Sequence, residues 1–365
     1  MHRLRTILLA LVLAAGCLTA WALAQDPSAY AVVNLVSDIP GVAPVTDSHL
    51  TDAWGFVFVD SGPFFIVNTN SSFATTYSVD GGTDAVQKVA PDLPVPELAP
   101  FPLGGPTDVV YNDTNDFTIG SGASTGPAKF IMSGLDGTIL AWKPGMPAVL
   151  VANDSASALA YTGLALANND GANLIYAANC AQARIDVYDK NFNLVNVPGG
   201  FANPAVPGYY MPFNIDNIGG KLYVAYAIFN PITMEEETGP GKGIVAVYDT
   251  GGNLIQNIAI GTDAGGPFWQ VNAPWGFTIA PHGFGTLNKA LLVGNFGDGA
   301  INAFDPATYA FLGQLSDATG TPIKIPSLWA LSPGNGTQAG AKHKLYFSAG
   351  PNNEADGLFG YIRVH

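Results

Sequence analysis

The chain has 365 residues, of which 12% are charged and 48% hydrophobic, with 43 Gly, 27 Pro and a net charge of −14. Soluble domains average about 25% charged residues, about 7% Gly and about 5% Pro, so this composition predicts many short strands joined by tight turns. The hydrophobic content excludes a disordered chain, and the negative charge argues against nucleic acid and anionic membrane surfaces as partners.

Residues 1–24 have the layout of a secretory signal peptide. Arg3 and Arg5 precede an apolar run, and an Ala-Leu-Ala triplet ends at Ala24, which is where we predict cleavage. The protein is therefore expected to be exported, to the periplasm or the extracellular space. An alternative is lipid attachment at Cys17, which follows an Ala-Ala-Gly triplet. No later apolar run approaches the roughly 20 residues of a membrane span.

Loss of the leader changes both the charge and the cysteine content. It leaves 12 basic and 28 acidic residues, a net charge of −16, and one cysteine, Cys180. An intrachain disulfide is then impossible, so stability must come from a buried core. Cys180 follows the apolar run LIYAAN, which indicates a small buried residue rather than a nucleophile.

An internal repeat fills the rest of the chain. Six similar turn-strand segments align on one position, with steps of 53, 55, 51, 62 and 54 residues between successive members. The aligned residues are Trp54, Thr107, Thr162, Phe213, Trp275 and Trp329. Regular recurrence of this kind favours packing between repeats over ligand stacking as the role of the three tryptophans.

The repeats contain signals for four short strands each, apart from the last, and no amphipathic helix pattern. After the opening segment comes a second β-rich run such as 174–180, then an alternating run such as 243–249, and then a fourth strand such as 253–260. Four strands per repeat and six repeats predict an all-β protein, a six-bladed β-propeller, as a single domain over residues 25–365.

The ends of the chain predict how the ring closes. The sixth repeat has only three strands and ends with 360–364, while an unassigned strand occupies 30–37. Pairing of these two segments would complete the last blade and avoid an exposed sheet edge. The longest step between repeats contains the acidic segment 231–243, which we expect to be a solvated surface loop in the fourth blade.

Long collinear strings between about Val33 and Gly360 carry a family resemblance. They include DIPGVAPVTDSHLTDAWGF, GPAKFIMSGLDGTILAWKPG, PFNIDNIGGKLYVAYA, GPGKGIVAVYD, LLVGNFGDGAINAFDPAT and GPNNEADGLFG. The chain resembles a family of exported bacterial proteins described as hypothetical. The resemblance implies a six-bladed propeller with the architecture of the NHL-repeat and gluconolactonase-like groups. Asn68 and Thr69 depart from the Asp-Asn pair expected at their position, which argues against a ligand role there.

Three residues form a candidate metal site. Glu354 lies in the acidic turn 350–357, and Asn295 and Asp298 lie in the glycine-rich segment GNFGDG. Gluconolactonase-like propellers hold one channel metal with Glu, Asn and Asp, and Ca²⁺ prefers such oxygen ligands, so the resemblance implies Ca²⁺ for this set. The alternative, which the residues favour, is that both segments are ordinary turns between strands, because Asn and Gly suit turns.

Other catalytic patterns are missing from the sequence. There is no H-E-x-x-H pair and no G-x-S-x-G elbow, and the Gly-rich stretches precede strands rather than helices. The sequence therefore favours a non-enzymatic binding or scaffold propeller, expected to be monomeric, that contacts a small molecule or an envelope protein. The alternative is a metal-dependent hydrolase or lactonase with its site at the central channel.

Overall fold

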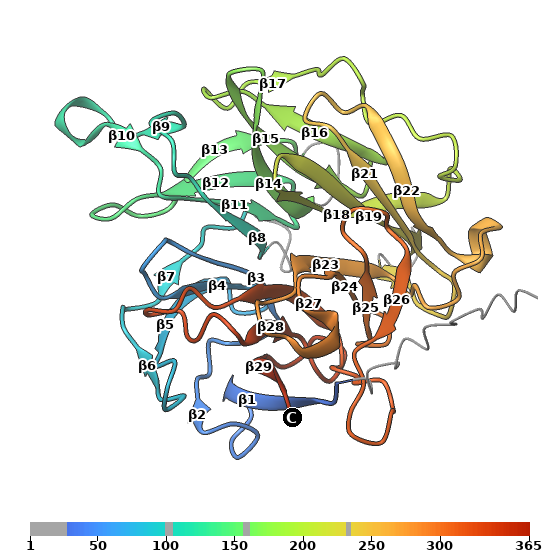
Figure 1. The fold of residues 1–365 in the computed structure, drawn as a ribbon. Coiled ribbons are helices and arrows are strands. Elements are labelled where there is room, and N and C mark those ends of the chain that lie inside the picture. Colours follow the sequence, from blue (N-terminus) through green and yellow to red (C-terminus); the bar gives the residue numbers. More distant parts are fainter. Residues whose placement is uncertain (1–27, 99–104, 156–160, 231–234) are drawn as a thin grey trace, which may run out of the picture.

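A computed structural model describes residues 28–98, 105–155, 161–230 and 235–365 of the chain. The proposed leader and Cys17 lie outside the described residues. Six antiparallel sheets surround a common centre, where the first strand of each sheet lies (Figure 1). These inner strands are β3 (Ala53–Phe58), β8 (Pro106–Tyr111), β14 (Tyr161–Asn169), β18 (Tyr210–Ile218), β23 (Pro274–Ile279) and β27 (Leu328–Pro333). The predicted six-bladed propeller is confirmed, with the aligned repeat residues all in inner strands.

Outside each inner strand the chain adds three more strands in turn. The second strands are β4 (Phe64–Asn68), β11 (Phe130–Gly134), β15 (Ala172–Asn179), β19 (Lys221–Asn230), β24 (Leu291–Asn295) and β28 (Leu345–Ala349). The third strands are β5 (Phe73–Val79), β12 (Thr138–Trp142), β16 (Arg184–Tyr188), β21 (Ile244–Tyr248), β25 (Ile301–Phe304) and β29 (Leu358–Val364). The outer strands are β6 (Val86–Lys88), β13 (Val149–Asn153), β17 (Leu194–Val195), β22 (Leu254–Ile260), β26 (Phe311–Gln314) and β1 (Tyr30–Ser37). Blades are numbered 1 to 6 in the order of the inner strands β3, β8, β14, β18, β23 and β27.

A few short strands and 3-10 helices lie outside this four-strand pattern. The minor strands are β2 (Val45–Thr46), β7 (Leu93–Pro94), β9 (Thr118–Ile119), β10 (Gly126–Pro127) and β20 (Glu235–Glu237). Short 3-10 helices cover η1 (Gly122–Ser124), η3 (Thr262–Ala264) and η4 (Gly285–Leu287). Within the described residues, no helix has the length and apolar character needed to cross a bilayer.

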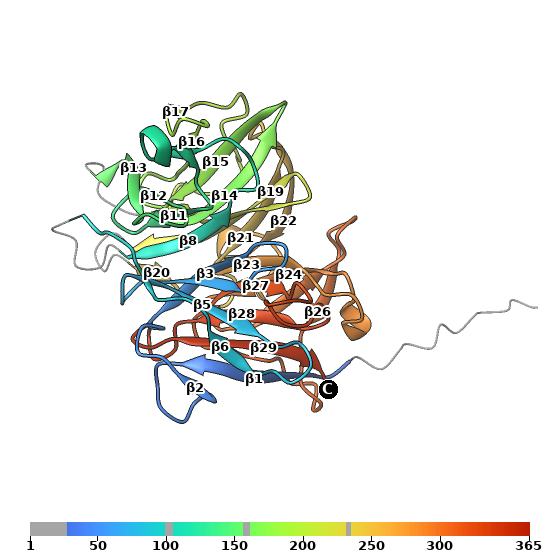
Figure 2. The ribbon, with the colours of Figure 1, turned by 90° about the vertical axis from the view of Figure 1, so that its left-hand side faces the viewer.

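The N-terminal strand closes the ring, as the repeat predicts. β1 pairs antiparallel with β29, with Tyr30 opposite Val364 and Ser37 opposite Leu358. Figures 1 and 2 show the two strands side by side in both views. The last blade thus combines both ends of the described chain, and β29 is not left as a sheet edge.

The acidic run in blade 4 differs from its expected loop. Residues Glu235–Glu237 form β20 and pair with the end of β19, where Ile228 lies opposite Glu237. β19 is long enough to extend beyond its other partner, β21, and its free backbone groups pair with the acidic segment. The sequence did not predict this strand because Glu is depleted in strands.

Candidate functional site

The centre of the propeller contains a cavity of about 810 Å³ lined by all six inner strands. Three carboxyl groups line it, from Asp108, Asp113 and Asp216. Its other polar side chains include four amides, and the apolar wall includes aromatic residues. The amides belong to Asn168, Asn173, Asn214 and Asn217, and the aromatic residues are Phe56, Phe58, Tyr111, Trp275 and Phe277.

A cluster of aromatic side chains occupies the start of the inner strands. Trp54 and Trp329 stack with ring centroids 3.7 Å apart, and Trp275 meets Trp329 edge-on at 5.5 Å. Phe213 and Phe296 pack against the same Trp329 ring. The cavity is lined mainly by the residues that follow these aromatics along each strand, so the cluster separates it from the turns that precede the inner strands. The tryptophans therefore pack between blades, as the sequence favours.

Asp108 is fixed in the cavity wall by backbone groups of its own blade and the next one. Its Oδ1 accepts the Val109 N–H at 2.8 Å, and its Oδ2 accepts the Leu164 N–H at 2.8 Å. The preceding blade provides Gly55, where any Cβ would overlap the Asp108 carboxyl. Burial raises the pKa of Asp108 well above its usual value, although the two backbone hydrogen bonds oppose the shift.

Asn214 repeats this arrangement two blades further on. Its side chain lies against Gly163 of the preceding blade, and its Nδ2 donates to the Trp275 carbonyl oxygen of the following blade at 2.8 Å. At the position after the aligned opener, blades 1, 3 and 5 have glycine, blades 2 and 4 have a polar residue, and blade 6 has Ala330. This pattern is visible in the sequence, but its meaning depends on which blades are neighbours.

Asp216, in blade 4, provides a second carboxyl group that faces the cavity. Burial raises its pKa to about 7, partly opposed by a hydrogen bond from the backbone N–H of Asn217. The charge of Asp216 in turn contributes to the raised pKa of Asp108, so the two carboxyl groups interact electrostatically. Sequence reasoning missed both residues, and the only signal was an acidic side chain within an otherwise apolar inner strand.

A second group of acids lies beyond the aromatic cluster. Asp52 is 1% exposed and accepts the indole N–H groups of Trp54 and Trp329. Burial, together with the charge of Glu354, raises the pKa of Asp52 well above its usual value. Burial also raises the pKa of Glu354 to about 7 and that of Glu236 to about 8.

The residues of the candidate calcium site lie in two different blades. Asn295 donates to Asp298 at 2.9 Å and also to the Gln270 carbonyl oxygen at 2.7 Å, all within blade 5 or its approach. Glu354 lies in the blade 6 turn between β28 and β29, and its electrostatic neighbours include Glu235. The structure brings Asn295 and Asp298 together, and the three-residue metal site stays a prediction.

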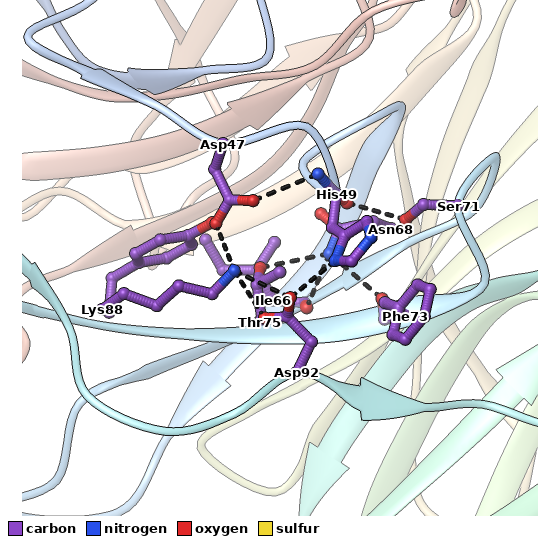
Figure 3. Close-up of polar contacts among 10 residues, drawn as sticks. Asp47, His49, Ile66, Asn68, Ser71, Phe73, Thr75, Lys88 and Asp92 are labelled. Atoms are coloured by element: carbon purple, nitrogen blue, oxygen red, sulfur yellow. Dashed lines mark hydrogen bonds and ion pairs between the residues drawn. The ribbon is translucent and has the colours of Figure 1, made fainter.

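A cluster of charged side chains fastens the loop before β3 to blade 1 (Figure 3). The His49 Nδ1 atom lies 2.6 Å from an Asp92 oxygen, and the Lys88 ammonium lies 2.6 Å from Asp47 and 2.7 Å from Asp92. The His49 ring also stacks on Phe73. Asp47, His49 and Asp92 are the one set of at least three His, Cys, Asp or Glu ligands found close together in the described residues. Lys88 already provides a cation between the two carboxylates, so this is an ion-pair cluster.

The thiol of Cys180 is the one cysteine side chain within the described residues. Cys180 is buried, and this burial, with a smaller contribution from Glu236, raises its pKa to about 12. A thiol with such a pKa carries almost no thiolate at neutral pH. The expectation of a small buried residue is confirmed.

Comparisons with known proteins place the chain among propellers. No protein-family model matches the sequence. The chain is 30% identical over 341 residues to "Uncharacterized protein R648" of Acanthamoeba polyphaga mimivirus, covering 90% of this chain and 78% of that protein. Among solved structures, the α-L-arabinofuranosidase Arb93A of Fusarium graminearum has a TM-score of 0.54 at 12% identity, covering 92% of this chain and 98% of the enzyme. A structural genomics protein of unknown function from Bacteroides thetaiotaomicron also has a TM-score of 0.54, at 10% identity, over 92% of this chain and 76% of that one. The two structures support the fold alone.

Proposed function

This chain belongs to the family of the mimivirus protein R648, and we propose that it is an exported binding propeller whose central cavity holds a small molecule. The observation that carries the proposal is the cavity of about 810 Å³ with carboxyl groups on its wall. Small-molecule sites typically measure about 300–1,000 Å³ and combine an apolar wall with a few placed polar groups. The cavity has both properties.

The chemistry of the wall supports a binding role. The described lining residues include no His, Cys, Lys or Arg, so the wall offers neither a thiol nor an imidazole base. Asp108 and Asn214 are tied to backbone groups of neighbouring blades, which makes them rigid positioning groups. Such a site can recognise a ligand without reorganising.

A blocked cavity provides the test. Val110 is half-buried and lines the cavity, so Val110→Trp should fill part of it. The protein would be incubated with a small-molecule extract and examined by native mass spectrometry for retained compounds. We expect wild-type protein to retain a ligand that Val110→Trp loses. The control, Val32→Trp, changes a residue that is 38% exposed on the outer strand β1 and should retain it. Equal retention by all three proteins would overturn the proposal.

Export rests on the leader-like residues 1–24. We propose cleavage after Ala24, with lipidation at Cys17 as the alternative. Expression with the native leader in a bacterial host, followed by intact-mass measurement, separates the two. A mature protein that begins at Gln25 supports cleavage after Ala24, whereas a lipidated N-terminal Cys17 supports the alternative.

A calcium-dependent hydrolase remains the second candidate, supported by the contact between Asn295 and Asp298. Glu354 would complete its metal set. A thermal melt titrated with Ca²⁺ tests it, and we would expect an upward shift that Glu354→Gln reduces. A melting temperature that does not respond to Ca²⁺ would remove this candidate.

A further inference from the structure

We propose that the molecule held in the central cavity is an organic cation, whose ammonium or guanidinium group lies between Asp108 and Asp216. This inference rests on the proposed function and specifies the ligand class. It goes beyond the family relationship, since it is drawn from the residues that line the cavity.

The charge on the cavity wall is the first argument. Asp108, Asp113 and Asp216 contribute three carboxyl groups, and no basic side chain belongs to the described lining. A cavity with acids and no internal cation favours a positive ligand and repels an anionic one.

The arrangement of the two carboxyl groups is the second argument. Asp108 projects from β8 in blade 2 and Asp216 from β18 in blade 4, with β14 between them. Both side chains line the same cavity, and the charge of Asp216 contributes to the raised pKa of Asp108. A cation between them would turn their repulsion into two attractive interactions. Asp108 needs little reorganisation, because Leu164 and Val109 already hold its orientation.

The apolar part of the wall specifies an organic cation rather than a bare metal ion. Tyr111, Trp275 and Phe277 line the same cavity. Aromatic faces attract ammonium and guanidinium groups and also pack against their carbon chains. A volume of about 810 Å³ greatly exceeds that of a bare ion, so the cavity has room for the carbon skeleton of an organic ligand.

Isothermal titration calorimetry on the full-length protein at pH 8 tests the inference. The probes are the cations putrescine, spermidine, agmatine and choline, the neutral analogue 1,4-butanediol, the anion succinate and CaCl₂. We expect at least one organic cation to bind ten times more tightly than butanediol and succinate. Asp216→Asn should weaken this binding at least tenfold, while Asp216→Glu retains most of it. Asp60→Asn, an exposed acid in the β3–β4 turn that does not line the cavity, should leave it unchanged.

Several outcomes would overturn the inference. In the first, butanediol or succinate binds as tightly as every cation. In the second, none of the organic cations binds, or CaCl₂ alone binds. In the third, a cation binds but neither Asp216→Asn nor Val110→Trp changes its affinity. Suppose that no organic cation binds, but that the wild type retains a neutral compound from the extract and Val110→Trp loses it. The cation inference is then wrong and the proposed function stands. If nothing is retained in a Val110-dependent way, the proposed function falls as well.

Discussion

The indole N–H of Trp329 donates a hydrogen bond of 3.1 Å to the carboxyl group of Asp52, which precedes it by 277 positions. The other oxygen of Asp52 accepts the indole N–H of Trp54 at 2.6 Å. One buried carboxyl group therefore joins the inner strands of blades 1 and 6, which are neighbours only because the ring is closed. It also fixes the stacked pair of indoles at the end of the cavity.

Asp52→Ala should destabilise the protein through these two indoles. The change leaves both buried N–H groups without their acceptor, at about 1–3 kcal/mol for each unsatisfied group. We expect the free energy of unfolding in urea, followed by tryptophan fluorescence, to fall by about 2–4 kcal/mol. Asp52→Asn retains one side-chain oxygen as an acceptor and should lose less. An alanine variant as stable as the wild type would contradict this role.

Gly360→Ala should weaken the closure of the ring. Gly360 lies in β29 opposite Asn34 of β1, and an added Cβ would overlap the Val33 carbonyl oxygen and the Phe347 ring. Overpacking of this kind costs about 1–3 kcal/mol. The melting temperature should fall, and hydrogen exchange of the β1 amides should accelerate. Gly208→Ala is the matched control, because a Cβ there meets no atom within 4 Å; equal effects of both changes would show that closure is not involved.

Glu236→Gln should change how stability depends on pH. Burial, with the neighbouring charge of Glu354, raises the pKa of Glu236 in the folded state to about 8 from its usual 4.5. The protonated form is then favoured by folding, so this contribution to stability is complete below about pH 4.5 and is lost as the pH rises through about 8.

The variant lacks this titration, so its melting temperature relative to wild type should increase between pH 5 and pH 8.5. Asp170→Asn is the control, since Asp170 is exposed and its positive φ of 48° suits asparagine. A difference between variant and wild type that is the same at both pH values would refute the assignment.

Lys88→Met should destabilise the loop that the ion-pair cluster holds. Although burial opposes it, the hydrogen bonds from Lys88 and Tyr77 lower the pKa of Asp47, so the lysine stabilises the carboxylate form. Exposed and half-exposed pairs contribute about 0–1 kcal/mol each, and Lys88 contacts two carboxylates, so we expect a loss of about 1 kcal/mol.

The loss should shrink in 1 M NaCl, because salt screens partly exposed charges. Lys190→Met, at an exposed lysine, serves as the control. A loss for Lys88→Met that is the same at both salt concentrations would show that packing, rather than charge, holds the loop.

The sequence determined the ring itself. The six aligned positions from Trp54 to Trp329 are spaced by one repeat length, and each falls in an inner strand because a local strand pattern is enough to define a blade. The closure of 30–37 onto 360–364 followed from counting strands, and the buried state of Cys180 followed from its apolar neighbours.

Only the tertiary structure decided which polar residues meet. Asp108 and Asp216 lie in blades 2 and 4, with blade 3 between them in the chain, and they line one cavity because the inner strands of all six blades surround it. Glu236 belongs to a strand because β19 extends past β21 and offers free backbone groups, although the acidic segment itself has a low strand propensity. The low charge content of the chain is explained by blades that are buried on both faces. The few buried acids form part of the candidate site. In a closed ring, the neighbours of an inner-strand side chain come from other repeats, so the sequence of one repeat does not show which acids line the same cavity.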